Sequence, residues 1–91
     1  MSVIVKIPSI LQELTKGLDT VEVSNVANVR QAMDKLEQKY TGLKAQLFDV
    51  KGKLSSVYDI YVNGESIYPN EMTTPLKDGD RIAIVMLYVG G

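Results

Sequence analysis

A single long helical pattern, between residues 28 and 42, sets the main limit on what this chain can fold into. Asn28 and Gln31 have the spacing of an N-terminal capping box, and Gly42 stands where a left-handed residue ends a helix. The apolar residues between them share one helix face, at Val29, Ala32, Met33, Leu36 and Tyr40. We therefore expect one main helix packed on a sheet.

The strand signals lie on both sides of this helix. Short β-branched or alternating runs cover residues 3–7, 20–23, 57–62, 65–68 and 81–88. Asn63-Gly64 is a strong signal for a tight hairpin, residues 77–80 (KDGD) form another turn, and residues 9–19 form a loop that turns at Gly17. A short helical turn is expected at residues 43–48. The order is β-β-α-β-β-β, with the first and last strands side by side at the sheet centre.

Composition excludes most side-chain chemistry. The 91 residues are 45% hydrophobic, which is enough for one domain, and they include no Cys and no His. Disulfides, thiolate nucleophiles, imidazole bases and Cys/His zinc sites are therefore excluded. Ten basic residues against 11 acidic ones give a net charge of -1, which favours neither nucleic acid nor an anionic membrane. With no long apolar span and no leader-like start, we expect a cytoplasmic protein.

Two carboxylates in the 77–80 turn are the nearest approach to a conventional site. Asp78 and Asp80 flank Gly79, and no third acidic residue or histidine stands near them in the sequence. A turn-capping role is favoured over a metal or acid-base role. Glycine-rich phosphate loops are also absent from the sequence. We expect neither a catalytic residue nor a metal ligand.

The end of the sequence is its most unusual feature. An apolar run over residues 82–89 leads directly into Gly90-Gly91. We expect residues 1–89 to form the domain and residues 90–91 a flexible tail, because glycine without a Cβ can enter channels too narrow for other residues. The carboxylate of Gly91 is ionised at neutral pH and a poor electrophile, so an adenylating partner would have to activate it.

The last strand carries apolar residues on both faces. Ile82, Ile84 and Met86 are expected to face the helix. The alternate positions then point to the other side, at Ala83, Val85 and Leu87. One helix covers only one face, so the second face is expected to be a partner surface. The alternative is that loops, or Leu43 and Leu47, wrap around and cover it.

These features together resemble the MoaD/ThiS sulfur-carrier family, and in particular its longer MoaD-like branch. The resemblance rests on residues 77–82 (KDGDRI), residues 60–65 (IYVNGE), residues 40–42 and 74–76, and the glycine pair. It implies an α+β fold of the ubiquitin-like β-grasp type, with a mixed sheet of four to five strands on one main helix. One departure is Met86, which stands where tails of this family usually carry a proline.

The resemblance also implies a function without catalysis by this chain. Gly91 would carry sulfur as a thiocarboxylate, and Gly90 would give it passage. An E1-like enzyme using ATP and Mg would adenylate Gly91, and no cofactor would be bound tightly by the carrier itself. The acceptor would be the large subunit of molybdopterin synthase, with this chain as the small subunit, or a cysteine synthase.

Two other functions stay open at this point. The chain could be a ubiquitin-like modifier joined through Gly91 to lysines of other proteins, or an interaction domain whose tail is incidental. Whichever holds, the residues expected to contact a partner are those around the end of the last strand. They are Val85, Leu87, Tyr88 and Val89.

Overall fold

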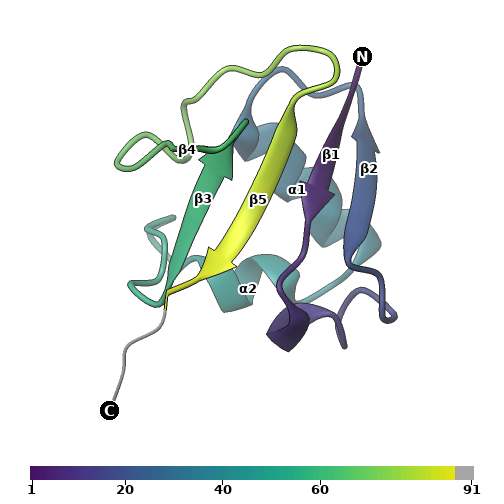
Figure 1. The fold of residues 1–91 in the computed structure, drawn as a ribbon. Helices are drawn as coiled ribbons and strands as arrows, with labels where there is room; N and C mark the ends of the chain where they lie inside the picture. Colours follow the sequence, from purple (N-terminus) through teal and green to yellow (C-terminus); the bar gives the residue numbers. More distant parts are fainter. Residues whose placement is uncertain (88–91) are drawn as a thin grey trace.

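The computed structural model describes residues 1–87 and contains one five-stranded sheet with a helix across one face (Figure 1). The strands are β1 (Ser2–Lys6), β2 (Thr20–Ser24), β3 (Tyr58–Val62), β4 (Glu65–Ser66) and β5 (Arg81–Met86). The helices are α1 (Val29–Lys39), the short α2 (Leu43–Leu47) and the 3-10 turn η1 (Ser9–Leu11). This confirms the predicted α+β class and element order. Among these residues, no helix is both long and apolar enough to cross a membrane.

The sheet has the predicted pair of strands at its centre. Its order is β2-β1-β5-β3-β4, and β1 runs parallel to β5 while all other neighbours are antiparallel. Figure 1 shows β5 between β1 and β3, with α1 behind the sheet. The side chains of Val3 and Val5 in β1 and of Ile82 and Ile84 in β5 are buried on the helix side. The alternation of burial along both central strands follows the two-residue period of a sheet.

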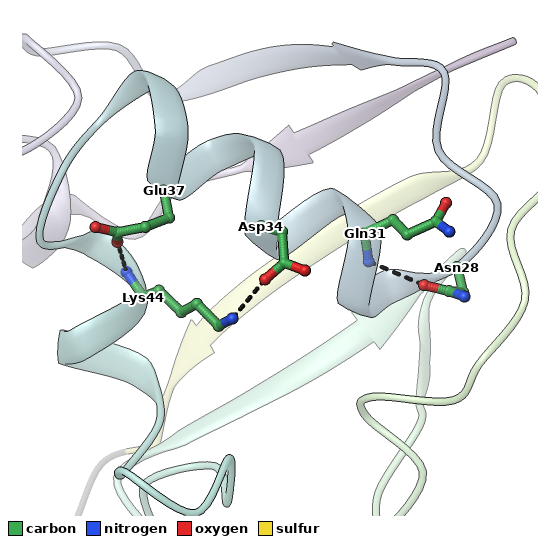
Figure 2. Close-up of polar contacts among 5 residues, drawn as sticks. All are labelled: Asn28, Gln31, Asp34, Glu37 and Lys44. Atoms are coloured by element: carbon green, nitrogen blue, oxygen red, sulfur yellow. Dashed lines mark hydrogen bonds and ion pairs between the residues drawn. The ribbon is translucent and has the colours of Figure 1, made fainter.

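The start of α1 follows the predicted capping pattern with one change. Figure 2 shows the Asn28 side chain accepting a hydrogen bond from the backbone N–H of Gln31 at 2.9 Å. Gln31 Oε1 accepts a hydrogen bond from the backbone N–H of Ala27, one residue before the cap, at 2.8 Å. All five residues of the predicted apolar stripe are buried. The local pattern therefore located this helix correctly.

A polar network joins α1 to α2 where the chain turns. Gly42 adopts a φ of +100°, as a left-handed residue should, and its N–H donates to Glu37 Oε2 at 2.9 Å. Glu37 Oε1 accepts from the N–H of Lys44 at 2.8 Å, and Lys44 Nζ pairs with Asp34 (Figure 2). The backbone hydrogen bonds from Gly42 and Lys44 lower the pKa of Glu37 below its ordinary value. Glu37 thus links the last turn of α1 to the start of α2 through two backbone donors.

Three predicted segments differ in detail. The strand expected at residues 65–68 pairs only over β4, because the N–H of Asn70 bonds the carbonyl of Ile67 at 2.6 Å and turns the chain away. The strand expected at residues 81–88 ends at Met86 within the described residues. The loop at residues 9–19 turns at Gly17 as predicted, with a φ of +84°, but it also buries Leu11 and Thr15.

Candidate functional site

A hydrogen-bonded turn holds the start of β5. Asp80 Oδ2 accepts from the backbone N–H of Lys77 at 2.7 Å, and Oδ1 accepts from Asn63 Nδ2 at 2.9 Å. The hydrogen bond from Asn63, followed by that from Lys77, lowers the pKa of the Asp80 carboxyl. Asp78 Oδ1 accepts from the N–H of Ser2 at 2.8 Å. Asp80 therefore caps the turn, as predicted, whereas Asp78 instead joins the turn to the start of β1. Within residues 1–87 there is no group of three potential metal ligands.

Asn63 links this turn to the β3–β4 hairpin. Its φ of +51° and that of Gly64 at +86° are the left-handed values that a two-residue Asn-Gly turn requires. Its Oδ1 accepts from the N–H of Arg81 at 2.9 Å, while its own N–H donates to the carbonyl of Arg81 at 2.8 Å. The beginning of β5 is therefore tied to β3 by side-chain and backbone bonds. This tie sets the direction in which β5 runs toward the tail.

The far end of β5 is the origin of the predicted reactive tail. The N–H of Leu87 donates to the carbonyl of Val57 at 2.7 Å, so the chain is held up to the last described residue. Val85 and Leu87 are 36% and 40% exposed, which places both predicted contact residues at the surface. The other four predicted site residues lie outside the described residues, namely Tyr88, Val89, Gly90 and Gly91. Contact with a partner stays a prediction for all of them.

Met86 does not lie in the core as its place in the alternation predicted. Its side chain is 46% exposed, whereas Ile84, two residues earlier, is 3% exposed. Met86 pairs with Tyr58, the first residue of β3, so it lies at the rim of the sheet. Tyr58 is itself buried there. Met86 is therefore a third exposed apolar residue near the end of β5, on the opposite face of the strand from Val85 and Leu87.

In the part of the chain that the structure describes, no helix lies over the outer face of the sheet (Figure 1). Ile4 is 39% exposed and Ala83 is half-buried, and the alternative covering residues Leu43 and Leu47 are buried in the core on the helix side. A hollow of about 640 Å³ lies on this face beside Arg81. Its lining is formed by Ile4, Lys6, Thr20, Asn63, Gly64, Arg81, Ile82 and Ala83. The expectation of an exposed apolar second face is confirmed, and what binds it stays open.

Sequence reasoning overlooked Ile4 and the two basic residues beside it. Ile4 alternates with Val3 and Val5, so the same period that placed those two in the core assigned Ile4 to the outer face. Lys6 and Arg81 come together because Ile4 pairs with Arg81 and Lys6 pairs with Ala83 in the parallel register of β1 and β5. That register depends on contacts between the two ends of the chain. No local motif signalled it.

Known proteins match this architecture over nearly its full length. The model of the ThiS family matches residues 5–91. CysO in the crystal structure of the Amycolatopsis orientalis BexX/CysO complex is 33% identical, with 98% of this chain and 99% of that chain covered and a TM-score of 0.87. Mycobacterium tuberculosis CysO is 31% identical over 94% of this chain and 99% of that one, with a TM-score of 0.86.

A third solved structure carries the name of a modifier. SAMP1 from Haloferax volcanii is 27% identical, with both chains covered completely and a TM-score of 0.83. No curated protein gives a significant match. These likenesses confirm the predicted ubiquitin-like β-grasp fold. They also bring the glycine pair at residues 90–91 within the matched region.

Proposed function

This chain belongs to the ThiS family, and we propose that it is a sulfur carrier whose Gly91 carboxylate is converted to a thiocarboxylate and donated to a biosynthetic acceptor enzyme. The observation that carries the proposal is the family match through Gly91, combined with a β5 strand that is hydrogen-bonded as far as Leu87. A rigid domain would then present a short tail to each partner in turn. The chain would act as a reactant and not as a catalyst.

The proposed chemistry has two steps at the Gly91 carbonyl. A carboxylate oxygen of Gly91 attacks the α-phosphorus of ATP in an E1-like partner and displaces pyrophosphate, which forms an acyl-adenylate. A hydrosulfide equivalent then attacks the carbonyl carbon and displaces AMP, leaving the thiocarboxylate and releasing a proton. The partner would supply ATP, Mg and sulfur. This chain supplies only a carbonyl that no side chain shields.

The side chains of the described residues support such a passive role. The sequence has no Cys that could capture the activated acyl group. Asp78 and Asp80 both accept backbone hydrogen bonds, from Ser2 and from Lys77. The pKa of Asp80 is lowered, and a carboxyl with a lowered pKa is unsuited to act as a general acid at neutral pH. The exposed apolar residues Val85 and Leu87 would instead contact the partner next to the tail.

For the acceptor, we favour an enzyme of cysteine synthesis over molybdopterin synthase. Both CysO structures are more than 30% identical to this chain over nearly its full length. One of them is a complex with a second protein, BexX, so a protein similar to this chain forms a complex. The likeness to a putative molybdopterin converting factor subunit from Pyrococcus furiosus, at 22% identity, supports the fold alone.

The test is an intact-mass measurement after co-expression with the E1-like enzyme and a sulfur source. Wild-type protein should gain the mass difference between sulfur and oxygen, and tandem fragmentation should place that change on Gly91. A variant without Gly90 and Gly91 should fold normally and show no such gain. The proposal fails if the wild-type chain stays unchanged while a known carrier is sulfurated in the same cells. Equal sulfur transfer by the deletion variant would instead favour an interaction domain with an incidental tail.

A second candidate is a protein modifier conjugated through Gly91 to lysines. The observation in its favour is the likeness to SAMP1, a small archaeal modifier protein, in two Haloferax volcanii structures at 27% and 25% identity. Activation by adenylation is common to both functions and does not separate them. Proteolytic digests of host proteins would do so, because conjugation leaves a Gly-Gly remnant on target lysines.

A further inference from the structure

The edge of the sheet formed by β2 is separated from β5 by β1. β2 is the edge strand of the sheet, and in the described part of the chain it pairs only with β1 (Figure 1). At five residues it is longer than β4, the strand at the other edge. An edge strand presents unpaired backbone N–H and C=O groups that can template another strand.

The register of β1 and β2 shows which backbone groups are free. The N–H of Ile7 donates to the carbonyl of Asp19 at 2.7 Å, and the N–H of Asn25 donates to the carbonyl of Met1 at 2.8 Å. Hydrogen-bonded pairs alternate along an antiparallel ladder, so Val21 and Val23 direct their backbone groups toward β1. The intervening residues of β2 direct theirs away from the sheet. They are Thr20, Glu22 and Ser24.

One of these outward groups is already occupied by a lysine from α1. Lys35 Nζ donates to the carbonyl of Ser24 at 2.7 Å. This contact closes the last carbonyl of the strand and leaves the groups of Thr20 and Glu22 directed outward. β2 also contains no proline that would block an added strand. In the described part of the chain, Lys35 thus shields the Ser24 end of the β2 edge, and the outward backbone groups of Thr20 and Glu22 stay accessible.

A groove between β2 and α1 runs beside this open edge. Its volume is about 170 Å³, and its floor includes the buried side chains of Val21, Val23 and Leu36. Lys35 and Lys39 also line it, and both lie on the α1 side. Glu22 and Ser24 of β2 also line the groove, on the strand side. Both are exposed positions that alternate with the two valines, so their side chains are directed toward the outer face of the sheet. The groove is therefore small, apolar at its floor and positively charged on its α1 side.

We propose that the β2 edge accepts an extended segment of a partner protein as an additional strand, with acidic side chains of that segment beside Lys35 and Lys39. The backbone groups of Thr20 and Glu22 would supply the main-chain hydrogen bonds, as in other cases of strand addition. The two lysines would select acidic residues at alternate positions of the segment, which are the positions that face the groove.

A second copy of this chain fits the edge less well than an acidic segment. Antiparallel pairing of two β2 strands over all five residues would place Glu22 directly opposite its counterpart. Like charges in directly opposed positions destabilise a strand pair. The β2 edge is separated from β5 by β1, so a segment bound there would leave the end of β5 accessible. The inference therefore does not depend on the chemistry proposed for Gly91.

The experiment uses the full chain, labelled with nitrogen-15, and a short capped peptide. Every second residue of the peptide is threonine, and the residues between the threonines are aspartate, valine and aspartate in that order. Binding should slow amide hydrogen exchange at Thr20 and Glu22, which are open in the free protein. A peptide with lysine in place of aspartate should bind at least threefold more weakly. N-methylation of the peptide at alternate residues should abolish the slowed exchange, because it removes the ladder donors.

Matched variants separate this edge from general charge attraction. Lys35→Gln combined with Lys39→Gln should weaken the acidic peptide about threefold to tenfold, whereas Lys51→Gln with Lys53→Gln in the 49–56 loop should leave it unchanged. The mass gain at Gly91 should be the same in both double variants. A loss of peptide binding at the β2 edge can therefore be told apart from a loss of the proposed carrier function. The inference is overturned if millimolar acidic peptide leaves exchange at Thr20 and Glu22 unchanged. If exchange at Thr20 and Glu22 slows with rising protein concentration in the absence of peptide, the inference is also overturned. The β2 edge would then pair with a second copy of this chain.

Discussion

Asp80 organises the start of β5 through both of its carboxylate oxygens. One accepts from the Lys77 N–H and the other from the Asn63 side chain, and its backbone carbonyl accepts from the N–H of Ile4 at 3.1 Å. One residue thus connects the turn, the β3–β4 hairpin and the first strand. Its ionised form is the one that these donors stabilise, which is the reason its pKa is lowered.

Replacing Asp80 should make stability both lower and less sensitive to acid. We expect Asp80→Asn to lower the free energy of unfolding by about 1 to 3 kcal/mol at neutral pH, because one charge-assisted bond is lost and an amide donor faces the Lys77 N–H. The folded pKa of Asp80 lies below its unfolded value, so its stabilisation is fully present above about pH 4 and is lost as pH falls through the folded pKa. Urea unfolding of both proteins from pH 7 to pH 2 measures this.

The difference between wild type and Asp80→Asn should therefore shrink in acid. Asp78→Asn is the matched control, since Asp78 makes one bond, to the N–H of Ser2, and its loss should cost less at neutral pH. A difference for Asp80→Asn that stays constant down to pH 2 would contradict the assignment of an ionised, structural carboxylate.

The rim position of Met86 leads to a second prediction at this scale. Ile84→Ala should lower the unfolding free energy by about 2 to 5 kcal/mol, because it opens a cavity in the core. Met86 lies two residues further along the same face, and Met86→Ala should lower the unfolding free energy by less than about 1 kcal/mol. Thermal or urea unfolding compares the two. Equal costs would mean that Met86 is packed in the core after all.

At the scale of elements, local signals predicted well what local forces determine. The α1 stripe, its Asn28 cap and the Asn63-Gly64 turn are all set by residues within a few positions of one another. The short β4 follows from the turn at residues 67–70, which the pattern of residues 65–68 did not indicate. The exposure of Met86 depends on where β5 ends against the start of β3, which is distant in the sequence. The basic pair Lys6 and Arg81 depends on the register between opposite ends of the chain. A single sequence carries no direct record of these long-range alignments.

The Asn28 cap gives a test of how far local signals act on stability. Asn28→Ala removes the acceptor for the Gln31 N–H and should lower the unfolding free energy by about 1 kcal/mol. Asn28→Ser keeps a side-chain acceptor and should be close to wild type. Urea titration measures the unfolding free energy of both variants. A loss as large for serine as for alanine would assign the effect to the backbone of residue 28 and not to its side chain.

For the whole molecule, the buried core and the exposed end of β5 are separate parts of the described structure. In residues 1–87 the core cluster lies between the sheet and α1, with α2 and loop residues completing it, and it does not include Ile4, Ala83 or Val85 of the other face. Substitutions on that face should therefore cost less stability than substitutions in the core. Within the described residues the exposed apolar side chains near that end are Val85, Met86 and Leu87. In the proposed carrier function, these exposed residues would contact the partner enzyme.

Leu87 is the described residue at which this separation can be tested. Leu87→Asp places a charge where we expect a desolvated partner contact, so the E1-like enzyme should thiocarboxylate it at least tenfold more slowly at limiting carrier concentration. The thermal transition should persist, because the side chain is 40% exposed. Intact-mass time courses and calorimetry measure the two effects separately.

Val50→Asp is the matched control for Leu87→Asp. Val50 is an equally apolar, fully exposed residue, but it lies in the loop between α2 and β3. The same change of charge there should leave both the rate and the transition as in wild type. Equal slowing by both variants would assign the effect to net charge. Loss of the thermal transition in Leu87→Asp alone would place Leu87 in the core, and the partner surface would then have to lie on the outer face around Ile4, without the end of β5.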